Sequence, residues 1–289
     1  MVLFDIIWTE LLRDLFPWAV DAFKLITELG SSAIYLAIIL IIFWGIDKRL
    51  GMVTTFVYIG SSILNYWVKA ILKYPRPAPS QWLTSAANYS LPSGHAQSAT
   101  TFYGWLTLKI NRWWMFIIGT TLIILVGISR IYLGVHWLGD VLLGWGIGIV
   151  IIILVWRFEN PISDYLSKYN TYHLYIGLVI LGGIAMVLTE LMLPVPTDNF
   201  GGSVGIVIGI GIGLALEKKF VNFTVKTPEK ETWKIFLRIS IGLILVLVVY
   251  YGTSLFLSSE DVLTAALLYC LIALVGAFVW PLIFSKIDL

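Results

Sequence analysis

The stretch Leu91-Pro-Ser-Gly-His95 stands directly before a hydrophobic segment at 94–110. A turn of proline and glycine that opens a helix points free backbone N–H groups at one spot, where the helix dipole also favours an anion. A histidine beside such a spot is a candidate proton donor. Taken alone, the stretch is more typical of an ordinary capped helix between two membrane spans, so its meaning depends on the rest of the chain.

The composition indicates an integral membrane protein. Hydrophobic residues make up 59% of the 289 residues and charged residues only 12%, with a mean hydropathy of +0.90. A soluble domain carries about twice that share of charge. No basic run interleaved with aromatic residues indicates a nucleic acid partner, and the net charge of +2 is small. The single cysteine, Cys270, excludes an internal disulfide and a metal site built from cysteines.

The hydrophobic segments predict an all-α membrane protein with about nine transmembrane helices. These segments lie at 29–46, 51–72, 94–110, 113–131, 137–156, 174–193, 200–216, 235–257 and 262–285. The first 29 residues mix apolar side chains with frequent charges, which predicts an amphipathic helix in the membrane interface. We therefore expect three parts, namely the interfacial helix at 1–29, a core bundle at 30–160 and an additional four-span bundle at 161–289.

The basic residues predict the orientation in the membrane. If Lys48 and Arg49 are cytoplasmic, thirteen of the nineteen Lys and Arg residues share their side, which places the N-terminus outside and the C-terminus inside. Four of the six exceptions lie in or directly beside the outer connections 73–93 and 129–137, where another reason must place them. The six exceptions are Arg13, Lys24, Lys69, Lys73, Arg76 and Arg130.

Glycines recur at every fourth residue of the seventh predicted span, at Gly201, Gly205, Gly209 and Gly213. This spacing gives a smooth ridge on one helix face. A channel lining is an alternative, but close packing against another helix is the favoured interpretation.

Lys69 and Arg76 form the first of three polar clusters on the predicted outer side. Pro75 and Pro77 end the helix, so Arg76 leaves it on an extended backbone. A guanidinium fork together with a point charge suits a phosphate group. Both side chains would equally well snorkel to lipid headgroups, so this cluster alone does not decide between the two roles.

The second cluster is the turn Pro92-Ser93-Gly94-His95, and the third is Ser129-Arg130-x5-His136-x3-Asp140. His136 and Asp140 are four residues apart at the start of a span, so they share one helix face. A carboxylate at that offset accepts from one ring nitrogen and leaves the other basic, as a nucleophile requires. The alternative is a capped helix start, although a carboxylate three residues inside an apolar span needs a partner.

The three clusters together favour chemistry on a phosphate group. Two histidines and one aspartate are a conceivable zinc site, but three neighbouring cations repel a metal ion and attract an oxyanion. We therefore expect no metal and no cofactor, with cations that balance a transferring phosphoryl group while a histidine attacks it.

These residues resemble a known family. Lys69-x6-Arg76-Pro77, Pro92-Ser93-Gly94-His95 and Ser129-Arg130-x5-His136-x3-Asp140 are similar, in order and in spacing, to the three signature motifs of the type 2 phosphatidic acid phosphatase superfamily. That superfamily includes lipid phosphate phosphatases, bacterial isoprenyl pyrophosphate phosphatases, glucose-6-phosphatase and vanadium haloperoxidases. The resemblance covers residues 69–140, so the core at 30–160 would be the phosphatase core.

The resemblance implies a role for each residue. His136 would attack phosphorus and form a phosphohistidine, Asp140 would orient and stabilise it, and His95 would protonate the leaving oxygen and then help to activate water. The phosphoryl oxygens would be held by the remaining motif residues, which are Lys69, Arg76, Ser93, Gly94 and Arg130.

The expected function is therefore that of a metal-independent phosphatase for a lipid phosphate or pyrophosphate. It would act among membrane lipids at the outer face of a bacterial or archaeal plasma membrane. A lipid phosphotransferase that resolves the phosphohistidine with an alcohol is one alternative, and a non-enzymatic anion or lipid transporter is another. The membrane architecture argues against a haloperoxidase.

The last four spans resemble the layout of the glucose-6-phosphatase and sphingosine phosphate phosphatase branches, and they would shape lipid entry, form a homodimer surface or enlarge the bundle.

Overall fold

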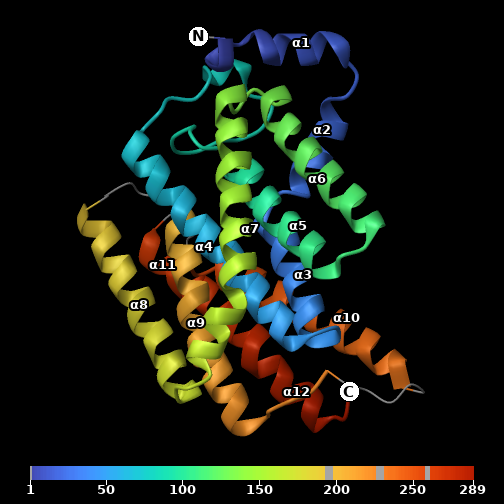
Figure 1. Ribbon diagram of the computed structural model, residues 1–289, viewed down its shortest axis with the longest axis vertical. Coiled ribbons are helices and arrows are strands. Elements are labelled where there is room, and N and C mark those ends of the chain that lie inside the picture. The colour runs from blue at the N-terminus through green and yellow to red at the C-terminus, as the bar shows by residue number, and fades with distance from the viewer. Residues whose placement is uncertain (1, 193–197, 226–230, 258–260) are drawn as a thin grey trace. The chain divides into compact units, whose positions relative to one another are not determined.

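The computed structural model describes residues 2–192, 198–225, 231–257 and 261–289 of the chain, except for the side chains of residues 198 and 199. Within these ranges the chain forms helices joined by short connections and has no strand (Figure 1). The predicted all-α class is confirmed.

The helices follow one another along the chain with short connections, except for a longer one at 73–93. The first part of the chain contains α1 (Ile7–Leu15), α2 (Val20–Glu28), α3 (Ser32–Gly45), α4 (Lys48–Leu72), α5 (Gly94–Ile110), α6 (Trp113–Tyr132) and α7 (Leu138–Leu166), with 3-10 turns at Val2–Phe4 and Pro79–Gln81. The second part contains α8 (Thr171–Met192), α9 (Asp198–Phe220), α10 (Thr232–Ser254), α11 (Val262–Leu274), the π-helical turn η4 (Val275–Val279) and α12 (Trp280–Lys286).

The described helices show an integral, multi-pass membrane protein, but they confirm the predicted nine spans only in part. Six of them are long and apolar enough to cross a membrane, and the bent pair α2 and α3 would add a seventh. The segments predicted at 51–72 and 94–110 are helices, α4 and α5, but they are too polar or too short to count by composition alone. Their polar side chains are buried inside the protein, as Asn65 and Gln97 are. Nine spans therefore stays a prediction.

The N-terminal 29 residues form two helices where we expected one. Pro17 lies in the break between α1 and α2, and it cannot continue a helix that has already begun. α1 exposes Ile7, Leu11 and Leu15 along one face. Its place in the membrane interface remains a prediction.

The chain divides into two compact units, each described here by itself. Unit 1 comprises Met1–Leu36 and Gly60–Phe158, and unit 2 comprises Ala37–Ile59 and Glu159–Leu289. All the residues predicted for the site belong to unit 1.

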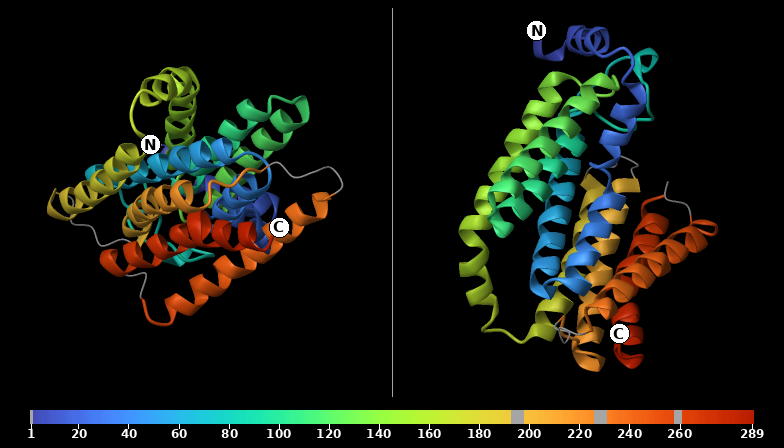
Figure 2. Two further views of the ribbon diagram at one scale, coloured as in Figure 1. Left: turned by 90° about the horizontal axis from the view of Figure 1, so that it is seen from below. Right: turned by 90° about the vertical axis from the view of Figure 1, so that its right-hand side faces the viewer.

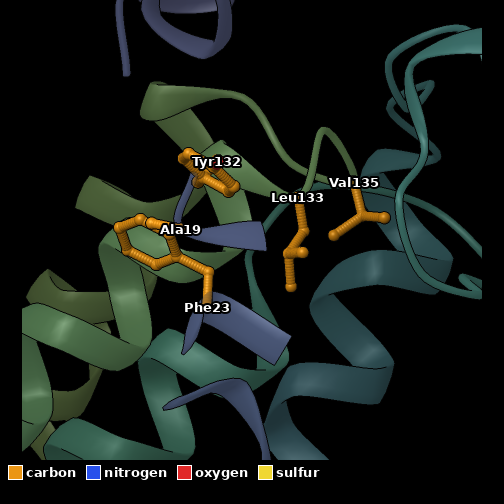
Figure 3. Packing of buried hydrophobic residues seen from close by; sticks show 5 residues of the cluster. All are labelled: Ala19, Phe23, Tyr132, Leu133 and Val135. Atoms are coloured by element: carbon orange, nitrogen blue, oxygen red, sulfur yellow. The ribbon is translucent and has the colours of Figure 1, made fainter. Parts of the chain in front are cut away.

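In unit 1, α6 packs against α5, α1 and α2. Figure 1 shows α1 running across the end of this unit at which α6 stops and α7 begins. Beneath it, Ala19 and Phe23 pack with Tyr132, Leu133 and Val135, and the rings of Phe23 and Tyr132 stack with centroids 4.1 Å apart (Figure 3). This buried cluster fixes the connection from α6 to α7, which carries His136.

In unit 2, α9 packs against α8 and α11 (Figure 2). The glycine ridge of α9 faces α11: a Cβ added at Gly205 would lie 2.2 Å from the carbonyl oxygen of Ala266, and one added at Gly201 would lie 2.3 Å from that of Val262. The two backbones therefore approach closely along the ridge. The prediction that these glycines serve helix packing is confirmed.

Replacing Gly205 by alanine should destabilise the protein, because the new Cβ meets the backbone of α11, which can retreat only by moving the whole helix. We expect a loss of about 1–3 kcal/mol in the free energy of unfolding in detergent, which is typical of overpacking. Gly183→Ala in α8 is the matched control, since nothing lies within 4 Å of its added Cβ. Equal unfolding midpoints for the two variants would contradict this account of the ridge.

Candidate active site

The predicted site residues come from several segments that meet at one end of unit 1. Lys69 lies in the last turn of α4, Arg76 in the connection 73–93, and Arg130 in the last turn of α6. Ser93, Gly94 and His95 form the start of α5, His136 lies between α6 and α7, and Asp140 lies in the first turn of α7. Helix ends that lie far apart in the sequence thus place their polar residues together.

His136 and Asp140 form the centre of the site. The ring nitrogen Nδ1 of His136 lies 3.0 Å from Oδ2 of Asp140, and both residues are buried. The same carboxylate oxygen accepts a hydrogen bond from the backbone N–H of Trp137, 2.9 Å away. Because Asp140 lies at the N-terminus of α7, the helix dipole also favours its negative charge. The expected contact between the two side chains is present, but His136 lies two residues before α7 begins, so the two residues do not share a helix face as predicted.

The other ring nitrogen of His136 shows which tautomer is present. Nε2 lies 3.0 Å from Nη1 of Arg76. A guanidinium group donates hydrogen bonds and cannot accept them, so Nε2 must offer its lone pair. Nδ1 then carries the proton and donates it to Asp140. This assignment leaves Nε2 as the basic nitrogen, which is the form that a nucleophilic histidine needs.

Arg76 is held by the backbone of two connections. Its Nη2 donates to the carbonyl of Ala87 at 2.7 Å and its Nε to that of Asn88 at 3.0 Å, while Nη1 donates to the carbonyl of Val135 at 2.6 Å. Arg76 therefore ties the connection 73–93 to the segment that carries His136. Burial lowers the pKa of Arg76 to about 10 and Asp140 opposes this shift, so the guanidinium stays charged at neutral pH.

The other two cations also bind neutral oxygen atoms. Nζ of Lys69 donates to the carbonyl of Tyr89 at 2.9 Å, and Nη1 of Arg130 donates to Oγ1 of Thr27 at 2.7 Å. Nε of Arg130 is buried and has no hydrogen-bond partner among the residues that the structure describes. Since carbonyl and hydroxyl groups do not neutralise a cation, the site keeps a positive charge that suits an anion.

The turn before α5 is both a helix cap and part of the site. Oγ of Ser93 accepts from the backbone N–H of Ala96 at 3.4 Å, and the backbone N–H of Ser93 donates to the carbonyl of Asp140 at 3.0 Å. A Cβ added at Gly94 would lie 3.2 Å from Oδ1 of Asn65. The side chain of Ser93 therefore acts as a helix cap for α5, while the backbone of the turn is hydrogen-bonded to the start of α7.

His95 follows in the first turn of α5 and is partly exposed. Its charged neighbours are Arg130, Lys69 and Arg76. The structure thus places His95 with the three cations of the predicted site.

Ser90 was missed by the sequence analysis. Its fully buried hydroxyl donates to Oδ2 of Asp140 and lies 3.3 Å from Nδ1 of His136, and its backbone N–H donates to the carbonyl of Tyr74. A serine in a connection belongs to no helical periodicity that would mark it as functional. The one signal in the sequence is its position directly before Leu91, where the second motif region begins. Among the described residues, no three His, Cys, Asp or Glu side chains form a group that would hold a metal ion.

Comparisons with known proteins match this site and the chain around it. The PAP2 superfamily matches residues 50–163, which include all three motifs, and the transmembrane extension of PAP2 superfamily phosphatases matches residues 201–289. Sphingosine-1-phosphate phosphatase 1 of Rattus norvegicus is 28% identical over 77% of this chain and 57% of that protein. The chain thus spans little more than half the length of that relative.

Two bacterial proteins are also similar. Phosphatidylglycerophosphatase B of Bacillus subtilis is 32% identical over 53% of this chain and 81% of its own length. The crystal structure of a transmembrane PAP2-type phosphatidylglycerolphosphate phosphatase from Bacillus subtilis shares 30% identity and has a TM-score of 0.46, over 50% of this chain and 79% of that one. The resemblance seen in the motifs is confirmed, and the chain belongs to the PAP2 superfamily of phosphatases.

Proposed function

We propose that this protein is a metal-independent phosphatase that releases phosphate from a phosphorylated lipid through a phosphohistidine on His136. The observation that carries the proposal is the pair of contacts on the two ring nitrogens of His136. Asp140 holds the protonated Nδ1, while Nε2 keeps its lone pair beside a positively charged group. This arrangement provides a neutral nucleophile next to the position where a phosphate would bind.

In the first step, the lone pair of Nε2 attacks phosphorus. An N–P bond forms and the P–O bond to the lipid breaks. His95, which takes up a proton when the negative charge of the bound phosphate offsets the cations around it, donates that proton to the leaving oxygen. Arg76 moves its Nη1 from Nε2 to a phosphoryl oxygen, and Lys69 and Arg130 bind the remaining charge. The ring of His136 becomes positively charged, and Asp140 stabilises that charge.

In the second step, water attacks the phosphohistidine. His95, now neutral, accepts a proton from the water as its oxygen bonds to phosphorus. The N–P bond breaks and its electron pair returns to Nε2, which restores the starting state. If an alcohol attacks in place of water, the phosphoryl group is transferred to a second lipid. The hydrolase function therefore predicts that labelled phosphate appears in solution and not on a second lipid.

Electrostatics keep His136 in its reactive form. Burial is the largest cause that holds its pKa well below the usual range of a histidine, and the neighbouring cations lower it further. These cations are Arg76, Lys69 and Arg130, with a smaller effect from His95. His136 is therefore the free base at neutral and mildly acidic pH.

Two features support a lipid substrate at the outer membrane face. The relatives that match the chain are named for sphingosine 1-phosphate and phosphatidylglycerophosphate. The site is formed at the ends of apolar helices, on the side that the distribution of Lys and Arg predicts to be extracytoplasmic. A lipid headgroup in that plane would reach His136 while its chains stay in the bilayer.

Replacing His136 by alanine should abolish phosphate release, because no other group takes the place of the attacking nitrogen. Removal of a nucleophile typically costs a factor of about 10⁴ or more in kcat. The measurement is phosphate release from phosphatidate, sphingosine 1-phosphate and an isoprenyl diphosphate in detergent with excess EDTA. The matched control is His173→Ala, since His173 is exposed at the start of α8. Full activity of His136→Ala would refute the mechanism.

Replacing Ser90 by alanine should lower kcat about tenfold with little change in KM, in line with the loss of one hydrogen bond to a charged group. Without this donor, Asp140 is a stronger partner for protonated His136, so the pKa of His136 rises. The acid limb of kcat/KM should therefore move to higher pH than in the wild-type protein on the same substrate. Ser90→Cys, with its weak donor, should fall between the two. An unchanged pH profile in Ser90→Ala would show that Ser90 only fills space.

A further inference from the structure

We propose that the turn from α2 to α3, residues 27–30, is part of the active site: Thr27 positions Arg130, and Gly30 positions the ring of His95. The proposal rests on the phosphatase function proposed above. This turn lies outside the three motifs and before residue 50, where the match to the PAP2 superfamily begins. Neither the motifs nor that match therefore assigns it a role.

Thr27 fixes one arm of the Arg130 guanidinium. Both side chains are buried, with 4% and 5% of their surface exposed, and Oγ1 of Thr27 accepts from Nη1 of Arg130 at 2.7 Å. Within the described part of the chain, Nε of the same guanidinium has no hydrogen-bond partner. A buried donor without an acceptor is costly, and a phosphoryl oxygen is the acceptor that this site would supply. Thr27 thus holds the guanidinium group of Arg130 in an orientation that leaves Nε available to the substrate.

Gly30 packs against the ring of His95. A Cβ added at Gly30 would lie 3.2 Å from Cδ2 of His95 and 2.6 Å from Cγ1 of Val126. Val126 is buried and its branched side chain is stiff, so it leaves little room for a methyl group. The added methyl group would therefore be pressed away from Val126, and the histidine ring on its other contact, at 3.2 Å, would also have to give way. Because His95 is the proposed proton donor, its position relative to the leaving oxygen depends on this glycine.

The turn is held against α5 independently of these two contacts. The hydroxyl of Tyr103 donates to the carbonyl of Leu29 at 2.6 Å. Tyr103 lies eight residues after His95, so both residues are on the same face of α5. The backbone N–H of Gly30 also donates to the carbonyl of Thr27 at 2.9 Å. One rigid turn therefore sets the positions of a phosphate-binding residue and of the proton donor.

The Thr27 contact is tested by the binding of a phosphate mimic. Orthovanadate affinity is measured from the thermal stabilisation of the full chain in detergent, which needs no turnover. Thr27→Val keeps the shape but removes the acceptor, and we expect about tenfold weaker binding, as for a lost hydrogen bond to a charged group. Thr27→Ser should bind like the wild-type protein. The control is Thr100→Val, because Oγ1 of Thr100 bonds only to a carbonyl of its own helix. Wild-type affinity in Thr27→Val would overturn this part.

The Gly30 contact is tested with two leaving groups. A long-chain alkyl phosphate needs a proton on its leaving oxygen, whereas p-nitrophenyl phosphate leaves as a stable anion. Gly30→Ala should lower kcat on the alkyl phosphate by about tenfold or more, as for a misplaced general acid, and should change kcat on p-nitrophenyl phosphate by less than about twofold. The control is Gly146→Ala, since nothing lies within 4 Å of its added Cβ.

Equal losses of activity on the two substrates, or no loss on either, would overturn the role of Gly30. If the wild-type protein releases phosphate from neither substrate, the proposed function itself is wrong. The vanadate comparison would then still decide whether Thr27 orders an anion site, so the two failures are distinguishable.

Discussion

The placement of three cations around one histidine–aspartate pair is the constraint on which the rest of unit 1 depends: Arg130 is buried, and Lys69 and Arg76 are partly buried. A buried cation is costly unless its donors find acceptors. Here the acceptors are mostly backbone carbonyls, such as those of Tyr89 and Ala87. Carbonyl oxygens satisfy the donors without cancelling the charge. The site therefore remains positively charged, which suits the anionic substrate that we propose for it.

This constraint explains why the connections of unit 1 are ordered by contacts with helices far away in the sequence. The long connection 73–93 must bring carbonyl groups to Arg76, so its own path has to be fixed. Arg13 of α1 does so by donating to the carbonyl of Gln81 at 2.7 Å and, through Nε, to that of Tyr132 at 3.0 Å. The N-terminal helices thus join the two connections that carry Arg76 and His136. Their amphipathic character serves this role as well as the predicted contact with lipid.

The motifs could be predicted from the sequence because their chemistry depends on local spacing. His136 and Asp140 are only four residues apart, so they meet at the start of α7 although His136 precedes the helix, and Pro75 and Pro77 follow directly on the end of α4. Ser90 and Thr27 could not be predicted, because each acts through one contact with a residue 50 or 103 positions away. The count of nine spans stays a prediction for a related reason. α4 and α5 bury polar side chains against each other, as Asn65 does with Gln97 at 2.8 Å, so hydropathy alone does not identify them as spans.

The six basic residues that the predicted orientation places on the outer side separate in the same physical way. Lys69, Arg76 and Arg130 bind the oxygen atoms of the site, and Arg13 joins two connections, whereas Lys24 and Lys73 are exposed. The positive-inside rule disfavours basic residues on the outer side of a membrane. A basic side chain there that is also shielded from water needs a favourable contact to offset the cost of its desolvation. Position in the sequence cannot distinguish these two groups, since Lys73 lies between Lys69 and Arg76. Burial distinguishes them, because an exposed lysine can reach lipid headgroups while a buried one must have a partner in the fold or in the substrate.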